Sequence, residues 1–304
     1  MNNIKELKLD RYIFIRNLIA FICASLIIIF TFWGVTYGLL EKPNEITPER
    51  GVFIFHLFTV NSNLLSLASA ILVVSFTIQG LLKKKYEVPS WAFQVLYCAT
   101  ICVFLTFNFS LALILPRNGV SAVIGMNLFL HILCPILCVI LFFMVSTDKH
   151  VNLLNSILVM IPFGLYALVY AIMVLILGEE NGGWRDIYHL FTYIPWYLVL
   201  IVMVPAVFGI SSLFRFLHNL VVNKRNYAVE SYVIREYKDL SKDELIDLAH
   251  SIGYYSIKDS KAKTIPVPLK DLYLIAKSNK NVELKDLVDS FSKGYLDHLK
   301  ELNQ

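Results

Sequence analysis

Long runs of apolar residues, separated by short polar breaks, make up the chain as far as residue 221. A helix needs about 20 mostly apolar residues to cross the hydrocarbon core of a bilayer. Six segments meet that requirement: 17–40, 52–82, 91–115, 121–146, 153–178 and 189–217. The pattern predicts an all-α fold, a bundle of six transmembrane helices.

The breaks between these segments contain the residues that end helices. The first, EKPNEITPERG, has two prolines and five charges, and the last, GEENGGWRD, combines glycines with charge. Both compositions are typical of turns. The second segment, at about thirty residues, is longer than the bilayer requires, so we expect it to tilt or to begin above the membrane surface.

Composition divides the chain into two parts. Hydrophobic residues make up 57% of it and charged residues 16%, whereas soluble domains average about 45–50% and about 25%. The excess lies early in the chain, so we predict a transmembrane domain, 1–221, and a small helical cytoplasmic extension, 222–304. In that extension Ser241 and Glu244 have the spacing of a capping box. It contains no catalytic motif, and we expect His250 and His298 to be solvated.

The basic residues near the ends of the segments predict the orientation, since Lys and Arg favour the cytoplasmic side. Ten of them fall on one side of the predicted bundle and four on the other. The ten are Lys5, Lys8, Arg11, Arg16, Lys83, Lys84, Lys85, Lys149, Lys224 and Arg225; the four are Lys42, Arg50, Arg117 and Arg185. Both termini are therefore expected in the cytoplasm, as an even number of spans requires, with the protein in the cell membrane.

Net charge and cysteine usage exclude several classes of function. The net charge of +4 does not indicate nucleic-acid binding, because the basic residues lie at membrane ends. The five cysteines all fall inside apolar runs and lack the spacing of a zinc site, so they are expected to pack as small hydrophobic residues. We expect no disulfide, no metal and no cofactor.

Several polar residues lie at a similar depth in the predicted bundle. Thr59 is about seven residues into the second span and His131 about ten into the fourth; both spans enter from outside, so their depths differ by only about 5 Å. Asn127 precedes His131 by one helical turn, and Asn108 lies near the outer end of the third span. Polarity is expected to concentrate in the outer half of the bundle.

Each polar group also has a purely structural interpretation. Asn61, Ser62, Asn63 and Asn108 can hydrogen-bond between helices without further function. Trp196 and Tyr197 fit an aromatic belt at the membrane surface. His131 is interpreted as the only histidine well inside an apolar span, where ionisable residues usually mark function.

Four segments together carry a family resemblance: FTVNSNLL, HILCPIL, PFGLYALVY and the aromatic start of the sixth span. In that order, over residues 12–217, they resemble the predicted six-transmembrane bacterial membrane proteins related to the androgen-induced family of eukaryotic membrane hydrolases. Those relatives hydrolyse fatty acid esters of hydroxy fatty acids with a catalytic threonine and histidine. The resemblance implies Thr59 and His131 as that pair, although the VNSN that follows Thr59 departs from the eukaryotic pattern.

The sequence therefore favours a membrane hydrolase of a lipid or other acyl ester. A neutral His131 could take the proton of the Thr59 hydroxyl, and Asn127, Asn61, Ser62 or Asn108 could orient the base or stabilise an oxyanion. We expect Thr59 and His131 within about 6 Å of one another, on neighbouring spans. The expected partners are the lipid bilayer and an apolar acyl substrate.

Two other functions stay open. One is non-catalytic binding or transport of a lipid or small ligand in the outer polar cavity. The other is a membrane scaffold whose cytoplasmic tail, 223–304, recruits a partner.

Overall fold

The computed structural model describes residues 3–41, 51–83, 88–119, 124–145, 150–188, 191, 195–237, 240–255, 269–279 and 282–302. Most of these residues are helical and no strand occurs among them, so the predicted all-α fold is confirmed. The chain divides into two compact units, Met1–Val222 and Asn223–Gln304. We call them the membrane unit and the C-terminal unit.

Five helices in the described part of the membrane unit are long and apolar enough to cross a bilayer. They are Phe14–Leu40, Phe58–Gly80, Ser90–Ala112, Leu153–Leu177 and Trp196–Lys224. The expected fourth span, 121–146, contains a shorter apolar helix, Leu128–Met144, and residues 121–123 and 146 lie outside the described residues. The number and length of these helices identify a multi-pass membrane protein.

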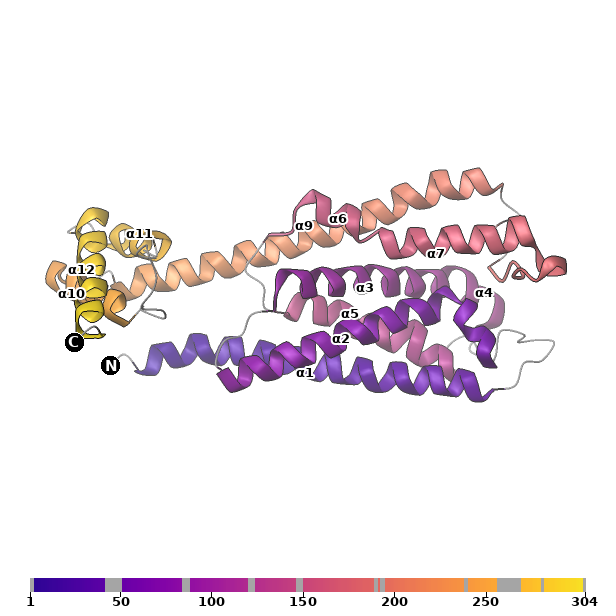
Figure 1. Cartoon of the computed structure of the whole chain (residues 1–304), viewed down its shortest axis with the longest axis horizontal. Helices are drawn as coiled ribbons and strands as arrows, with labels where there is room; N and C mark the ends of the chain where they lie inside the picture. The colour runs from indigo at the N-terminus through magenta and orange to yellow at the C-terminus, as the bar shows by residue number, and fades with distance from the viewer. Residues whose placement is uncertain are drawn as a thin grey trace. The chain divides into compact units, whose positions relative to one another are not determined.

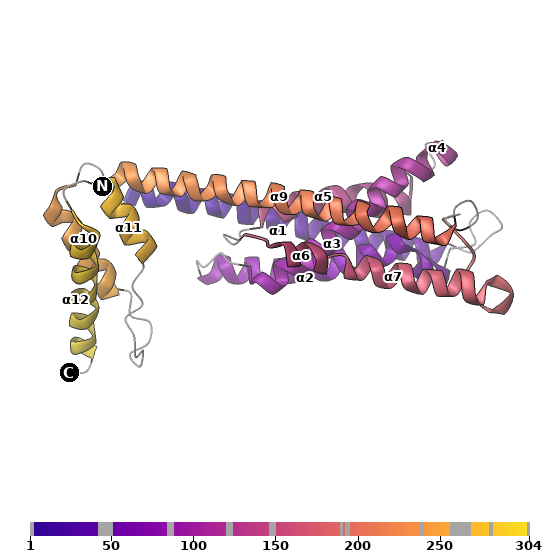
Figure 2. The ribbon, with the colours of Figure 1, turned by 90° about the horizontal axis from the view of Figure 1, so that it is seen from above.

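Four helical segments form the packed centre of the membrane unit. α1 (Asn3–Leu40), α2 (Phe58–Lys83) and α3 (Ser90–Phe109) lie side by side with the helix made of η4 (Leu128–Leu133) and α5 (Cys134–Met144), as Figures 1 and 2 show. Facing side chains such as Ile27, Leu96 and Leu141 are fully buried between them. Burial of these apolar faces sets the positions of the helices relative to one another.

The remaining helices of the membrane unit are more exposed. They are α6 (Leu153–Leu158), α7 (Ile161–Ala171) with its continuation η5 (Ile172–Leu177), and α9 (Trp196–Tyr237), which belongs to this unit as far as Val222. Large apolar side chains on them, including Ile176 and Ile201, are 74% and 64% exposed. Helices that are apolar on all faces are typical of membrane spans, since acyl chains cover what the protein does not.

Two expectations about the spans need correction. Residues Gly51–His56 form a separate 3₁₀ helix, η1, and α2 begins only at Phe58, which explains the excess length of the second segment. The last span runs to Lys224 rather than 217, and it contains His218, which is 1% exposed. His131 is therefore not the only histidine buried in an apolar span.

The C-terminal unit has a small apolar core of its own. α10 (Lys242–Tyr255), α11 (Leu269–Ser278) and α12 (Leu284–Leu302) meet around Leu245, Leu272 and Phe291. The predicted capping box is confirmed: Ser241 N–H donates to Glu244 Oε2 at 2.8 Å, and Glu244 N–H donates to Ser241 Oγ at 3.3 Å. These bonds satisfy two of the backbone donors that the start of a helix leaves open.

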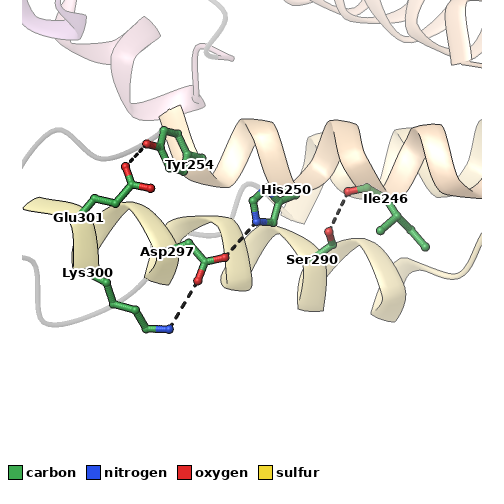
Figure 3. Close-up of polar contacts among 7 residues, drawn as sticks. All are labelled: Ile246, His250, Tyr254, Ser290, Asp297, Lys300 and Glu301. Atoms are coloured by element: carbon green, nitrogen blue, oxygen red, sulfur yellow. Dashed lines mark hydrogen bonds and ion pairs between the residues drawn. The ribbon is translucent and has the colours of Figure 1, made fainter.

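α10 and α12 run parallel, with polar contacts along their seam (Figure 3). Ser290 Oγ donates to Ile246 O at 2.8 Å, and His250 Nε2 lies 3.2 Å from Asp297 Oδ2. The ring of His298 stacks on Tyr254 with centroids 4.3 Å apart. The expectation that both histidines are simply solvated is therefore wrong, because the parallel seam gives each of them a partner.

Candidate active site between α2, α3 and η4

α1 fixes the position of the helix that carries His131. Thr31 Oγ1 lies 3.5 Å from Cys134 Sγ, and glycines at 34 and 38 allow close approach of the same helix. A Cβ on Gly34 would lie 2.8 Å from Leu130 Cδ2, and one on Gly38 would lie 2.4 Å from Met126 Sδ. Small residues four apart let membrane helices approach closely. This spacing brings η4 against α1.

A π-helical turn and a proline together leave one carbonyl of η4 without its helical donor. Cys134 N–H donates to Phe129 O, five residues earlier, instead of to Leu130 O. Pro135, next in the chain, has no N–H to offer. Asn63 of α2 supplies the missing bond, since its Nδ2 donates to Leu130 O at 2.9 Å.

The same amide of Asn63 also anchors Thr59. Its Nδ2 donates to Thr59 O at 2.8 Å, so one side chain holds a carbonyl beside each predicted catalytic residue. Asn63 is fully buried, and its Oδ1 makes no hydrogen bond in the described part of the chain. The prediction that spans two and four are neighbours is confirmed by this bridge.

A second π-helical turn supplies the direct partner of His131. η2 (Ser110–Ile114) continues α3 and is followed by Pro116 in α4 (Leu115–Asn118). Ser110 Oγ hydrogen-bonds His131 Nδ1, and the two side chains are 7% and 6% exposed. π-helical turns occur often at functional sites. Here two of them contribute the two members of one buried contact.

Hydroxyl groups extend this contact back to α2. Ser110 Oγ also lies 2.8 Å from Thr106 O, and Thr106 Oγ1 lies 3.0 Å from Ser62 Oγ. Ser62 Oγ in turn donates to Thr59 O at 3.0 Å. The network therefore joins the predicted nucleophile's backbone to the predicted base through α3.

The network favours one tautomer of His131. A serine hydroxyl has a single proton, and Thr106 O is a well-placed acceptor for that of Ser110. With the Ser110 proton directed to Thr106 O, Nδ1 carries the ring proton and donates it to Ser110. Nε2 then has the lone pair and is the nitrogen that can accept a proton.

The predicted site residues do not all meet. Thr59, Ser62 and His131 are buried and belong to the network, although no hydrogen bond joins Thr59 to His131 among the described residues. Asn61 is exposed and donates to Phe55 O and Leu57 O, at the start of α2. Asn108 is also exposed and donates to Phe104 O of its own helix. Their supporting roles, like the 6 Å separation, stay predictions.

Asn127 lies just before η4 and is half-buried. Its side chain makes no hydrogen bond in the described part of the structure and does not cap the π-helical turn. A polar group at this position, one turn from His131, is available to a bound molecule. Its predicted role in orienting the base or stabilising an oxyanion is therefore untested.

Tyrosine hydroxyls hydrogen-bond the backbone at the start of α2, next to Thr59. Phe58 N–H donates to Tyr188 Oη at 2.8 Å, and Tyr166 Oη donates to His56 O at 2.6 Å. Tyr170 Oη donates to Asp186 Oδ1 at 2.9 Å. Of the aromatic belt, Trp196 and Tyr197 are 54% and 50% exposed. At the start of span six, residues 189–190 and 192–194 lie outside the described residues.

The sequence did not identify Ser110 and Thr106 as members of the site, and it gave Asn63 only a structural role between helices. Their signal was weak because serine, threonine and asparagine occur throughout membrane helices as structural groups. Pro135, four residues after His131, was the usable signal, since a proline inside a span frees a carbonyl that another helix must satisfy. In the described residues, no group of three metal-binding side chains is found.

Comparison with known proteins adds no assignment. No protein-family model, curated protein or solved structure matches the chain.

Proposed function

We propose that the membrane unit is an integral membrane hydrolase that cleaves a lipid or other acyl ester, with His131 as the base. The observation that carries the proposal is a buried histidine whose Nδ1 is held by Ser110, beside a helix whose Thr59 carbonyl is anchored by Asn63. A buried ionisable side chain inside a membrane span is a functional candidate by default. The resemblance of FTVNSNLL and HILCPIL to the androgen-induced family of hydrolases supports the same reading.

The two hydroxyls near His131 take different roles in this proposal. Ser110 holds Nδ1 and so leaves Nε2 as the base, a positioning role that requires no reaction of its own. Thr59 is the nucleophile: Nε2 takes its proton while Oγ1 attacks the substrate carbonyl. The protonated imidazole then gives that proton to the departing alkoxide, which leaves an acyl ester on Thr59.

Water completes the cycle. His131 takes a proton from water, the hydroxide attacks the acyl-threonine carbonyl, and the proton returns to Thr59 Oγ1 as the carboxylic acid leaves. This sequence needs no second acid or base, because every proton transfer goes through the one imidazole of His131. The apolar walls of the bundle favour an acyl substrate that enters from the bilayer.

The proposal includes a topology. We place the protein in the cell membrane with six spans and both termini in the cytoplasm, as the ten basic residues against four support. The shorter apolar helix Leu128–Met144 counts as the fourth crossing. Cysteine-accessibility labelling of intact cells at residues 45 and 120 is expected to reach both from outside.

Turnover and covalent labelling of full-length protein in lipid nanodiscs test the chemistry. A panel of lipid and fluorogenic esters measures turnover, and a fluorophosphonate probe reports the nucleophile. Thr59→Ala and His131→Gln are each expected to lower turnover by at least about 100-fold, the usual contribution of a general base. Ser75→Ala is the matched control, since the exposed Ser75 hydroxyl bonds only its own helix, at Ile71 O.

Ser110→Ala separates the two hydroxyls. We expect a partial loss of turnover with labelling of Thr59 retained, and recovery in Ser110→Thr. Labelling that survives in Thr59→Ala and disappears in Ser110→Ala would identify Ser110, and not Thr59, as the nucleophile. Turnover equal to wild type in both Thr59→Ala and His131→Gln would contradict the hydrolase proposal. Non-catalytic binding of a lipid or small ligand would then be the better account of the membrane unit.

A further inference from the structure

A second polar cluster lies in the membrane unit, where α3, α6 and α9 meet. Tyr97 Oη donates to Ser211 O and lies 3.4 Å from Ser156 Oγ. Both Tyr97 and Ser156 are fully buried. The cluster therefore joins three helices through hydroxyl groups, away from the candidate active site.

Arg215 is the charged member of this cluster. It lies in the span Trp196–Lys224, nine residues before Lys224 and so about 13 Å from that end of the helix. It follows Ser211, whose carbonyl accepts the hydrogen bond from Tyr97, by one turn of α9, and so lies beside the cluster. A cation at this depth needs a partner, because hydrocarbon cannot solvate it.

The described residues do not provide that partner. Arg215 makes no ion pair with any of them, and its Nε is buried without a hydrogen-bond acceptor. Ser212 Oγ, one turn earlier on α9, is also buried and has no hydrogen bond in the described part of the structure. Arg16 shows the alternative, since its Nη2 donates to the carbonyls of Met144 and Val145 at the end of α5.

Two unsatisfied donors beside one positive charge define what can bind. The ligand must be an anion with several acceptor oxygens, and a phosphate group has them in a geometry that fits the guanidinium fork. The neighbours on α9, Leu213 and Phe216, are 53% and 57% exposed apolar side chains. In a bilayer these side chains face acyl chains, so the ligand approaches from lipid rather than from water.

We propose that Arg215 and Ser212 bind the phosphate of an anionic phospholipid whose acyl chains lie against Leu213 and Phe216. The guanidinium is long enough to reach towards the headgroup region while its stem stays among apolar side chains. Asn219, one turn nearer the helix end, pairs with the backbone of Val151, and so fixes α9 beside the start of α6. The site does not depend on the hydrolase proposal.

Native mass spectrometry of the full-length protein tests the site. The protein is released from nanodiscs of phosphatidylcholine with or without phosphatidylglycerol, and the retained lipid is counted. We expect wild type to retain phosphatidylglycerol, and Arg215→Met to bind it at least about tenfold more weakly, the effect of losing a charge-assisted hydrogen bond. Lys224→Met removes the same charge from an exposed position on the same helix and is expected to bind as wild type does.

Two further measurements test the role of the guanidinium and the identity of the ligand. Arg215→Lys keeps the charge and the fold but loses the fork, and is expected to bind several-fold more weakly. In neutral detergent, phosphatidylglycerol is expected to raise the thermal unfolding temperature of the protein. Inorganic phosphate is expected not to raise it. Stabilisation by inorganic phosphate alone would overturn the assignment to lipid, and equal lipid retention by wild type and both Arg215 variants would overturn the site.

Discussion

Two helix crossings in this protein depend on glycine, but the glycines face different atoms. In the membrane unit, Gly34 of α1 faces the tip of the Leu130 side chain. In the C-terminal unit, a Cβ on Gly253 would lie 2.0 Å from Phe291 O, and one on Gly294 would lie 2.0 Å from His250 O. A side-chain tip can rotate away, whereas a backbone carbonyl moves only with its helix. The second crossing is therefore the less tolerant of the two.

The polar contacts at the two crossings also differ, and the solvent explains why. In the membrane unit the contacts are buried and the acceptors are uncharged: Thr31 lies against Cys134, Asn63 donates to Leu130 O, and Arg16 donates to backbone carbonyls at the end of α5. In the C-terminal unit they include charged groups at the surface, such as Lys242 with Asp286 at 2.8 Å. Lipid offers no hydrogen bonds and cannot solvate charge, so neutral groups that satisfy backbone carbonyls are favoured there. In water, exposed ion pairs are tolerated but contribute little.

The largest expected effect is that of adding a methyl group where α10 meets α12. Gly253→Ala and Gly294→Ala each force the two helices apart, and we expect a loss of about 1–3 kcal/mol in the local free energy of unfolding. Hydrogen exchange of α10 and α12 in the full-length protein measures it. Ser251→Ala, on the exposed side of α10, is the control, and equal protection in Gly253→Ala and Ser251→Ala would mean that the crossing is not close.

A smaller effect is expected at the α1 crossing. Gly34→Ala meets atoms of Leu130 that can rotate, and alanine favours the helix, so we expect a net loss of no more than about 1 kcal/mol. Gly209→Ala is matched to it, because nothing lies within 4 Å of the added Cβ on α9. Thermal unfolding in detergent is expected to show Gly209→Ala at or above wild type and Gly34→Ala below it. A loss at Gly34 as large as that at Gly253 would contradict the comparison.

The smallest expected effect is a loss of stability in acid, which should occur at the crossing of α10 and α12 and not at the crossing of α1 with η4. Hydrogen bonds from Ser241, Lys242 and His250 lower the pKa values of Glu244, Asp286 and Asp297 respectively. Carboxyls in unfolded chains titrate near about pH 4. Because the folded-state pKa values are lower, the stabilisation is fully present above the unfolded values and is lost as pH falls through the folded ones.

Hydrogen exchange corrected for its intrinsic pH dependence measures this response. Protection of α10 and α12 is expected to fall below about pH 4, while residues 31–38 of α1, TFWGVTYG, contain no acid or histidine and should keep theirs. Asp297→Asn is expected to reduce the pH response of the C-terminal unit. An unchanged response in that variant would show that the His250 contact does not contribute.

Local signals in the sequence were enough to predict a multi-pass membrane protein, its helices and a helical C-terminal tail. The length of an apolar run determines whether a helix can cross a bilayer, and a capping box needs only Ser241 and Glu244, three residues apart. Even there, the end of the last span was placed early, because the apolar run continues past residue 217 and only the polar residues from Asn223 onward end it. That boundary kept His218 from being compared with His131.

The candidate site was predictable only in part. Thr59, Ser62 and His131 could be proposed from residue type and depth, but the contact of Ser110 with His131 required the register of two π-helical turns. The carbonyl of Leu130 is open to Asn63 only because Cys134 N–H bonds Phe129 O, one residue further back, and Pro135 has no N–H. Such contacts join residues dozens of positions apart and depend on the rotation of each helix about its axis. Apolar periodicity is too weak in an all-apolar span to determine that rotation, so the packing of the bundle decides it.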